Sequence, residues 1–172
     1  MSFPVRPMIH AVKRFSMDII IAAVGTRMPD WVDTAFAEYR KRMPREARIK
    51  LLELKPEKRD GGKTAQQVMR AEAARIDAAL PKGCYRIVLD EHGKQWRSVD
   101  LADALQKWLA AGRDVALIIG GAEGLAPEIK AHADFGWSLS PLTLPHALVR
   151  VVLAEQLYRA ISILQHHPYH RE

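Results

Sequence analysis

The chain has 172 residues, of which 48% are apolar and 27% charged, and its formal net charge at pH 7 is +6. This length fits one domain, and the apolar fraction is enough for a hydrophobic core, which excludes a wholly disordered chain. No apolar run approaches the roughly 20 residues of a membrane span, so no membrane partner is expected. The single Cys84 excludes an internal disulfide and no cysteine–histidine motif indicates zinc, so we expect a cytoplasmic protein without a metal.

The positive charge is unevenly distributed. Three of the six net charges fall in residues 1–16, MSFPVRPMIHAVKRFS, which contain no acid. This segment has neither the apolar core of a secretory signal nor a helical or strand period. We interpret residues 1–16 as a disordered extension and residues 17–172 as one folded domain. Because this domain is only mildly basic, it permits an RNA partner without requiring one.

The first half of the chain alternates between strand and helix patterns. Residues 18–24 (DIIIAAV) are a continuous apolar run, which is typical of a strand buried on both faces. Residues 30–42 carry aromatic side chains at helical spacing, and residues 49–54 (IKLLEL) predict a second strand. The basic, glycine-rich segment KPEKRDGGK predicts a mobile loop, and residues 64–80 predict an alanine-rich helix.

The second half continues the same alternation. We expect a strand over residues 85–90, a helix over 98–111 with Ser98 as its N-cap, a strand over 115–119, a short helix over 126–133, a strand over 137–144 and a long helix over 147–165. This order predicts a single α/β domain with a mostly parallel sheet and helices on both faces. In such folds ligands bind beyond the carboxyl ends of the strands. Three segments fall there, namely DEHGK, GGAEG and PLTLPH.

The glycine-rich segment GGAEG directly follows an expected strand. Two glycines allow a tight turn and a close approach of backbone N–H groups to a ligand. The segment lacks the Lys-Ser/Thr of a phosphate-binding loop and the GxGxxG spacing, so neither a nucleotide triphosphatase nor a Rossmann dehydrogenase is supported. An ordinary strand-to-helix turn is the open alternative.

The segment LSPLTL, residues 139–144, is small, apolar and interrupted by Pro141. A proline here argues against a central strand that keeps all its ladder hydrogen bonds. The segment suits a loop whose backbone faces a flat apolar ligand such as an adenine ring, although a plain strand end remains the alternative.

Longer motifs resemble a known family. The opening AVGTRMPDWV, the segment IIGGAEGL, the run WSLSPLTLPHALVRVVLAEQLYRA and the terminal HHPYHRE resemble the ribosomal RNA large subunit methyltransferase H family, of the SPOUT class of S-adenosylmethionine-dependent RNA methyltransferases. The resemblance runs from Met17 to Glu172. It implies a C-terminal trefoil knot, an obligate homodimer, and methylation of N3 of a pseudouridine in the 23S ribosomal RNA of the assembled ribosome.

The resemblance also implies which residues bind the S-adenosylmethionine cofactor. They lie at the end of the third strand, in the glycine turn and in the 139–144 segment, and they are Leu89, Gly120, Gly121, Leu139, Ser140, Pro141, Leu142, Thr143 and Leu144.

Methyl transfer to a nitrogen requires positioning of the acceptor and removal of its proton. The candidates for these catalytic tasks are His146 and Arg150 at the start of the last helix, and Tyr169 and His170 in the tail. Arg150 either hydrogen-bonds loop carbonyls, the interpretation we favour, or contacts RNA. A frayed end and a weak metal site are the alternatives for the histidine-rich tail.

Lys58, Arg59 and Lys63 in the basic loop, with Arg171 in the tail, are the expected contacts to RNA phosphates. Basic patches of this kind are often only solvated surface. The last helix is apolar on more than one face, which indicates either a two-fold interface or a central core helix. A non-catalytic ribosome-binding module and a metal-dependent hydrolase are the competing function classes.

Overall fold

The computed structural model describes residues 16–171, so the expected extension at residues 1–16 lies, apart from Ser16, outside the described residues. Five strands form one sheet in the order β2-β1-β4-β3-β5, and every neighbouring pair is parallel. The strands are β1 (Met17–Val24), β2 (Ala47–Leu54), β3 (Tyr85–Gln95), β4 (Val115–Ile119) and β5 (Phe135–Ser138). The helices are α1 (Asp30–Arg40), α2 (Ala65–Ala79), α3 (Ser98–Ala111), α4 (Pro127–Ala131) and α5 (His146–Leu164).

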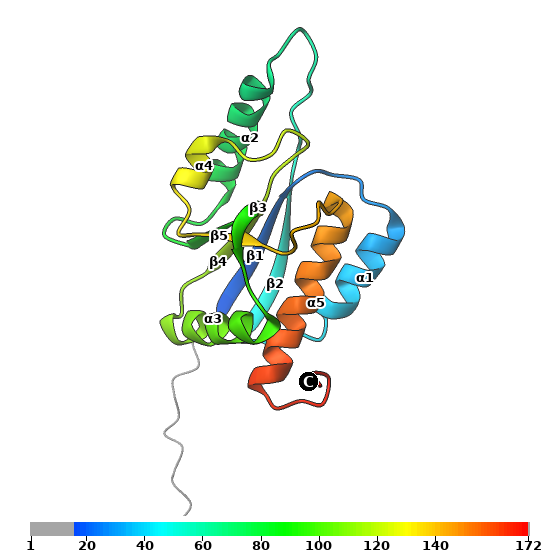
Figure 1. Cartoon of the computed structure of the whole chain (residues 1–172), viewed down its shortest axis with the longest axis vertical. Coiled ribbons are helices and arrows are strands. Elements are labelled where there is room, and N and C mark those ends of the chain that lie inside the picture. The colour runs from blue at the N-terminus through cyan, green and yellow to red at the C-terminus, as the bar shows by residue number, and fades with distance from the viewer. Residues whose placement is uncertain (1–15, 172) are drawn as a thin grey trace, which may run out of the picture.

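Helices cover both faces of the sheet, as the sequence predicts (Figure 1). Successive side chains of a strand point to opposite faces, so Ile19 and Ile21 of β1 pack among side chains of α1, α3 and α5. Ile20 packs on the other face, in the cluster that includes Ile76 of α2 and Ile129 of α4. Burial on both faces explains why β1 is a continuous apolar run.

Two helix starts show how the local sequence sets the fold. Thr64 caps α2 in a capping box with Gln67, in which each side chain accepts a hydrogen bond from the other residue's backbone N–H. The prediction that Ser98 caps α3 is wrong, because Arg97 occupies that position and its N–H binds the Asp100 carboxylate. The Ser98 hydroxyl instead donates to the Gln156 side chain at 2.7 Å and joins α3 to α5.

The fifth strand is shorter than predicted. β5 ends at Ser138, and the chain continues to Pro145 as an irregular loop, so the expected strand over 137–144 is wrong for most of its length. The Ser138 hydroxyl donates to the Ser140 carbonyl at 3.0 Å, and the Leu142 N–H donates to the Ser140 hydroxyl at 2.9 Å. Pro141 has no N–H for a ladder, which explains why the strand stops before it.

The third strand is longer than predicted and carries a bulge. Its register with β5 shifts between Leu89 and Lys94. Gly93 lies so close to the neighbouring strand that an added Cβ would be 2.7 Å from backbone atoms of Gly136 and Trp137. A bulge redirects the side chains beside it, and this one lies at the carboxyl edge of the sheet.

The strand order reverses between β1 and β4. The chain passes from β1 to β2 at one edge of the sheet, and the remaining strands lie on the other side of β1. Ligand sites in open α/β sheets lie outside the carboxyl ends of strands at such a switch point.

Candidate functional site

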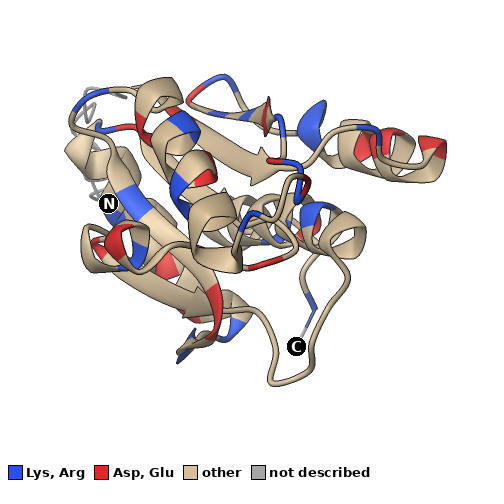
Figure 2. Cartoon of the chain, turned by 90° about the horizontal axis from the view of Figure 1, so that it is seen from above, with Lys and Arg blue, Asp and Glu red and all other residues tan. Residues whose placement is uncertain are grey.

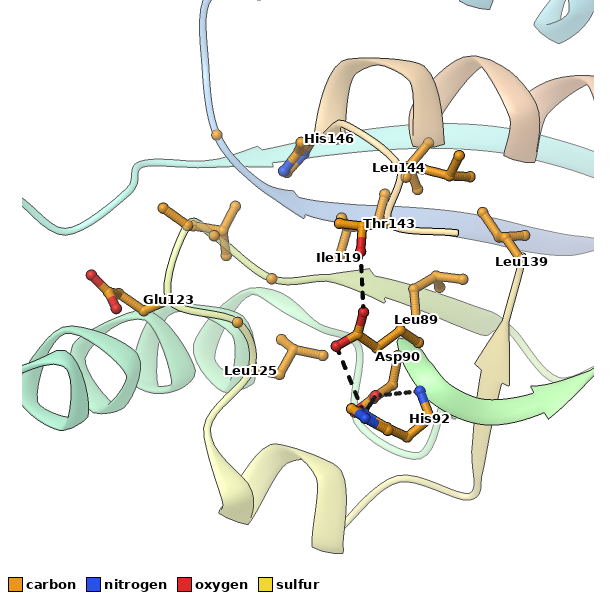
Figure 3. Close-up of a pocket in the computed structure, with 18 of the residues that line it drawn as sticks. Leu89, Asp90, His92, Ile119, Glu123, Leu125, Leu139, Thr143, Leu144 and His146 are labelled. Atoms are coloured by element: carbon orange, nitrogen blue, oxygen red, sulfur yellow. Dashed lines mark hydrogen bonds and ion pairs between the residues drawn. The ribbon is translucent and has the colours of Figure 1, made fainter. Parts of the chain in front are cut away.

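A cavity of about 770 Å³ opens at this switch point, between the carboxyl ends of the strands. Its volume lies within the range of known small-molecule and cofactor sites. Figure 3 shows Leu139, Thr143, Leu144 and His146 on one side of the cavity and Leu89, Asp90 and Leu125 on the other. The apolar part of the lining consists of Val24, Pro56, Leu89, Ile119, Ala122, Leu125, Trp137, Leu139, Leu142, Leu144 and Val149.

The glycine turn after β4 borders the cavity with backbone atoms. An added Cβ at Gly120 would lie 2.8 Å from the Gly124 carbonyl carbon and 2.9 Å from Leu125 Cγ, so only glycine fits there. Gly121 and Gly124 form an antiparallel bridge, and the Gly124 N–H donates to the Gly121 carbonyl at 3.0 Å. Gly124 has a φ of +84°, a conformation that favours glycine. The turn is therefore shaped for close backbone approach to a ligand.

The residues expected to bind the cofactor come together at this cavity. All of them line it except Pro141, which lies within the same loop but is not among the lining residues. Leu142 is 71% exposed at the mouth of the cavity. The structure thus places segments from positions 89, 120–121 and 139–144 around one space, and their contacts to a cofactor stay predictions.

His146 and Arg150 are four residues apart and share one face of α5. Arg150 is 1% exposed, donates to the Glu53 carboxylate at 3.0 Å and donates to the Gly25 carbonyl at 2.8 Å. These contacts agree with the hydrogen-bonding role that we favour for Arg150, which lies behind the cavity lining. His146 itself lines the cavity.

The imidazole of His146 lies in an unusual environment. Burial lowers the pKa of His146, and the positive charge of Arg150 lowers that pKa further. A hydrogen bond with the Gly120 backbone and the charge of Glu53 act weakly in the other direction. Its Nε2 atom is buried and has no hydrogen-bond partner within the described chain. A neutral imidazole at the cavity can accept a proton at neutral pH.

The sequence interpretation missed a polar part of the lining, which consists of Asp90, Glu91, His92, Glu123 and Lys130. Asp90 accepts the His92 N–H at 2.9 Å and forms an ion pair with Lys130 of the α4 helix. The hydrogen bond from Lys130 holds the pKa of Asp90 below its usual value. The DEHGK segment marked this strand end in the sequence, but no pattern indicated that Lys130 would meet it.

Tyr169 and His170 in the tail lie away from the cavity. Tyr169 donates its hydroxyl to the Glu155 carboxylate at 3.0 Å and packs against Tyr158, toward the carboxyl end of α5. Burial raises the pKa of Tyr169, with hydrogen bonds to Tyr39 and Glu155 adding to the effect. Neither Tyr169 nor His170 lines the cavity of its own chain. Their expected catalytic role therefore remains untested.

The basic loop adjoins the cavity rim. Arg59 is exposed and forms an ion pair of 2.7 Å with Glu123 of the glycine turn, and Lys63 pairs with Glu57 at 2.6 Å. Lys58 is exposed, as is Arg171 in the tail. Basic and acidic positions are mixed over the elements rather than gathered on one face (Figure 2).

Residues 16–171 offer neither a metal site nor a membrane-spanning helix. This part of the chain contains no group of three or more histidine, cysteine, aspartate or glutamate side chains placed to hold a metal ion. None of its helices is both long enough and apolar enough to cross a membrane.

The fully parallel sheet and the cofactor-sized cavity at its switch point make this an α/β protein with a ligand site at the carboxyl ends of its strands. The family model described as "Predicted SPOUT methyltransferase" matches residues 17–170. The chain is 61% identical over 155 residues to ribosomal RNA large subunit methyltransferase H of Ralstonia nicotianae, covering 90% of this chain and 99% of that protein. It is 57% identical over 156 residues to the protein of the same name from Laribacter hongkongensis, covering 91% and 100%.

The chain therefore belongs to the SPOUT methyltransferases and, within them, to the ribosomal RNA large subunit methyltransferase H family. It is a methyltransferase. A solved structure from Haemophilus influenzae Rd KW20, described as a "probable methylase family protein", shares the fold at a TM-score of 0.52 and 12% identity. That match covers 87% of this chain and 66% of the other, so the fold is shared although little of the sequence is.

Proposed function

We propose that the chain transfers a methyl group from S-adenosylmethionine to N3 of a pseudouridine in 23S ribosomal RNA, acting in the cytoplasm on the assembled ribosome. One observation carries this proposal: the glycine turn and the 139–144 loop, which the family resemblance assigns to the cofactor, line the same cavity. Family membership supports methyl transfer, and the names of the relatives support ribosomal RNA of the large subunit as acceptor.

The lining fits the chemical character of the cofactor. Leu89, Leu139 and Leu144 offer apolar surface to an adenine ring, and the Gly120 backbone offers a close approach that no side chain obstructs. The polar edge at Asp90 and Lys130 offers both charges to the hydroxyl, ammonium and carboxylate groups of such a molecule. A cavity of about 770 Å³ leaves room for an acceptor base beside it.

The reaction needs an activated methyl group, an acceptor nitrogen and a proton acceptor. S-adenosylmethionine supplies the methyl group from a sulfonium, whose sulfur keeps the electron pair of the broken C–S bond. The protein's task is to hold N3 in line with that bond, and positioning of reactants at about 3–3.5 Å accounts for much of the rate in such reactions.

His146 is the residue best placed to accept the N3 proton. It lines the cavity, its lowered pKa keeps it neutral at pH 7, and its Nε2 has no partner in the described chain. Arg150 holds the ends of β1 and β2 together behind it, through the Gly25 carbonyl and the Glu53 carboxylate. We assign proton acceptance to His146 and positioning to Arg150.

A homodimer and a trefoil knot complete the proposal. Leu142 and Leu148 near the start of α5, together with Trp31 of α1, are large apolar side chains that are exposed in a single chain. Exposed apolar groups of this kind support a protein interface. The knot rests on family membership. In a homodimer Tyr169, His170 and Arg171 of one chain become available to the cavity of the other.

The direct test is a transfer assay with the purified full-length chain and isotope-labelled S-adenosylmethionine. Intact ribosomes, isolated large subunits and protein-free 23S ribosomal RNA serve as separate acceptors. We expect label on the intact ribosomes, and a digest should release it as one N3-methylated pseudouridine. Label on another nucleoside would overturn the proposed target, and equal label on protein-free RNA would overturn the requirement for the assembled ribosome.

A further inference from the structure

Glu72 is a buried carboxylate outside the cavity lining. It lies on α2, is 4% exposed, and is the one acidic residue among the buried residues of the described chain. Burying a carboxylate is unfavourable unless neighbouring groups compensate for its lost hydration. A buried acid that neither lines the cavity nor forms an ion pair therefore calls for another structural role.

One oxygen of Glu72 holds the basic loop. Its Oε1 accepts a hydrogen bond from the Glu57 N–H at 3.0 Å. Arg75, almost one helical turn further along α2, donates to the Lys55 carbonyl at 2.8 Å and pairs with the Glu57 carboxylate. Lys63 also binds that carboxylate. The start of the loop that carries Lys58 and Arg59 is thereby fixed to α2.

The other oxygen of Glu72 lies against the glycine turn. Oε2 makes no hydrogen bond within the described chain, and an added Cβ on Gly121 would lie 2.8 Å from it. The same Cβ would lie 3.1 Å from Oε1 and 3.1 Å from Val24 Cγ1. The carboxylate thus fills the space that a side chain at Gly121 would need, and it sets how closely α2 and the turn approach.

A second contact joins the same two segments at the surface. Arg59 of the loop and Glu123 of the turn form an ion pair of 2.7 Å. Their side chains are 61% and 25% exposed, so this pair alone is a weak link. Together with the buried contacts of Glu72, it connects the basic loop to the glycine turn at two points, and Pro56 at the start of the loop lines the cavity itself.

We propose that Glu72 is a positioning residue that couples cofactor binding at the glycine turn to the conformation of the basic loop, the expected RNA contact. The proposal rests on the proposed function. Binding that orders the turn also orders the loop, because one carboxylate contacts both. Coupling between two sites is reciprocal, so RNA held on the loop in turn favours cofactor binding.

Hydrogen exchange of the full-length chain, with and without S-adenosylhomocysteine, tests this coupling. The probe is the demethylated product of the cofactor and is not consumed. We expect it to slow amide exchange in the turn at residues 120–124, which lines the cavity, and also in the loop at residues 58–63, which does not. Glu72→Ala should retain slowing in the turn, lose it in the loop, and weaken binding of the probe about tenfold, within the usual range of coupling between sites.

Two variants serve as controls. Glu72→Gln keeps an oxygen that can accept the Glu57 N–H, so it should retain the loop response. Asp77→Ala removes an acid from the same helix that pairs with Arg86 instead, and it should behave as the unchanged protein. A merely structural role for Glu72 would lower the melting temperature without separating the loop response from the turn response.

The outcomes separate this inference from the proposed function. Slowing at residues 120–124 of the unchanged protein with none at 58–63 overturns the coupling and leaves methyl transfer standing. A loop response that survives in a folded Glu72→Ala variant overturns the assignment to Glu72. If that variant does not fold, Glu72→Met keeps most of the side-chain volume without the acceptor oxygens, and a loop response that survives in Glu72→Met overturns the assignment. No slowing anywhere contradicts cofactor binding itself, and with it both proposals.

Discussion

Arg150 donates a hydrogen bond of 3.0 Å to Glu53, although the two residues are 97 positions apart in the chain. The guanidinium is buried and also binds the Gly25 carbonyl, so it joins α5 to the carboxyl ends of two strands. Removal of the buried guanidinium leaves the Gly25 carbonyl without this donor and removes the ion pair of Glu53, whose carboxylate is partly exposed to water. The start of α5 and the back of the cavity therefore depend on one side chain.

We predict that Arg150→Ala lowers the free energy of unfolding by about 3 kcal/mol. Glu53→Gln should cost about 1 kcal/mol or less, because the Glu53 side chain is 39% exposed and water screens its interaction. Urea denaturation of both variants and of the double variant measures these effects. A loss below about 1 kcal/mol for Arg150→Ala would show that the buried contacts are not structurally important.

Gly120→Ala should distort the glycine turn, because the new Cβ would lie 2.8 Å from the Gly124 backbone. We expect a stability loss of about 1–3 kcal/mol, typical of overpacking, and at least about tenfold weaker binding of S-adenosylhomocysteine by calorimetry. Gly136→Ala is the matched control, since its Cβ would meet its nearest neighbours at 3.9 Å. Equal affinities of the two variants would contradict the assignment of the turn to the cofactor.

The lowered pKa of His146 makes stability depend on pH. Protonation is less favourable in the folded chain than in the unfolded chain, so His146 contributes stability above its ordinary pKa of about 6.5. That contribution is lost as the pH falls through the lowered value. Between pH 7 and pH 5 the unchanged protein should lose more stability than His146→Gln, which does not titrate. Parallel losses in urea titrations of the two proteins would refute the shift.

An NMR titration of the His146 ring gives an independent measurement of the same shift. The resonance is assigned by its absence from His146→Gln, and its midpoint should lie below about 6.5. In the transfer assay, loss of the proton acceptor should reduce kcat by about 10²–10⁴-fold, the usual contribution of a general base. A variant with full kcat would remove His146 from the reaction.

Replacing Lys58, Arg59 and Lys63 together with alanine should weaken ribosome binding and flatten its salt dependence. Each lost phosphate contact reduces the slope of log K against log salt by about 0.7–0.9. We expect Lys58 alone to account for a larger change than Lys63, because Lys63 is already bound to Glu57. Lys107→Ala on α3 is the control. An unchanged slope in the triple variant would exclude this loop from the RNA interface.

Much of the fold could be predicted because burial on both faces leaves a strong signal. The apolar runs of β1 and β4 marked two central strands, and their glycine-rich or polar successors marked the edge that carries the cavity. The end of β5 was mispredicted because the small apolar residues of LSPLTL extended the expected strand, although Pro141 favoured a loop. The hydrogen bonds of the Ser138 and Ser140 hydroxyls with the backbone show that the loop interpretation of residues 139–144 is the right one. The cap of α3 was misassigned because Ser98 found a partner in the distant Gln156.

The site was only partly predictable for a related reason. Segments such as GGAEG shape the cavity through their local backbone, and the sequence placed them at the ends of strands. Lys130 and Glu72 matter because the fold brings them to Asp90 and Gly121, which are far from them in the chain. Patterns among neighbouring residues contain no information about contacts between residues that are far apart in the chain. For the same reason, local patterns could not predict that Tyr169 lies beside Glu155 and not at the cavity.

The central claim is tested most directly by mass spectrometry of 23S ribosomal RNA from cells that lack this gene. The account predicts that one pseudouridine loses a single methyl group at N3. The gene should restore that methyl group, and the Gly120→Ala and His146→Ala variants should restore much less of it. An identical modification profile with and without the gene would contradict the account.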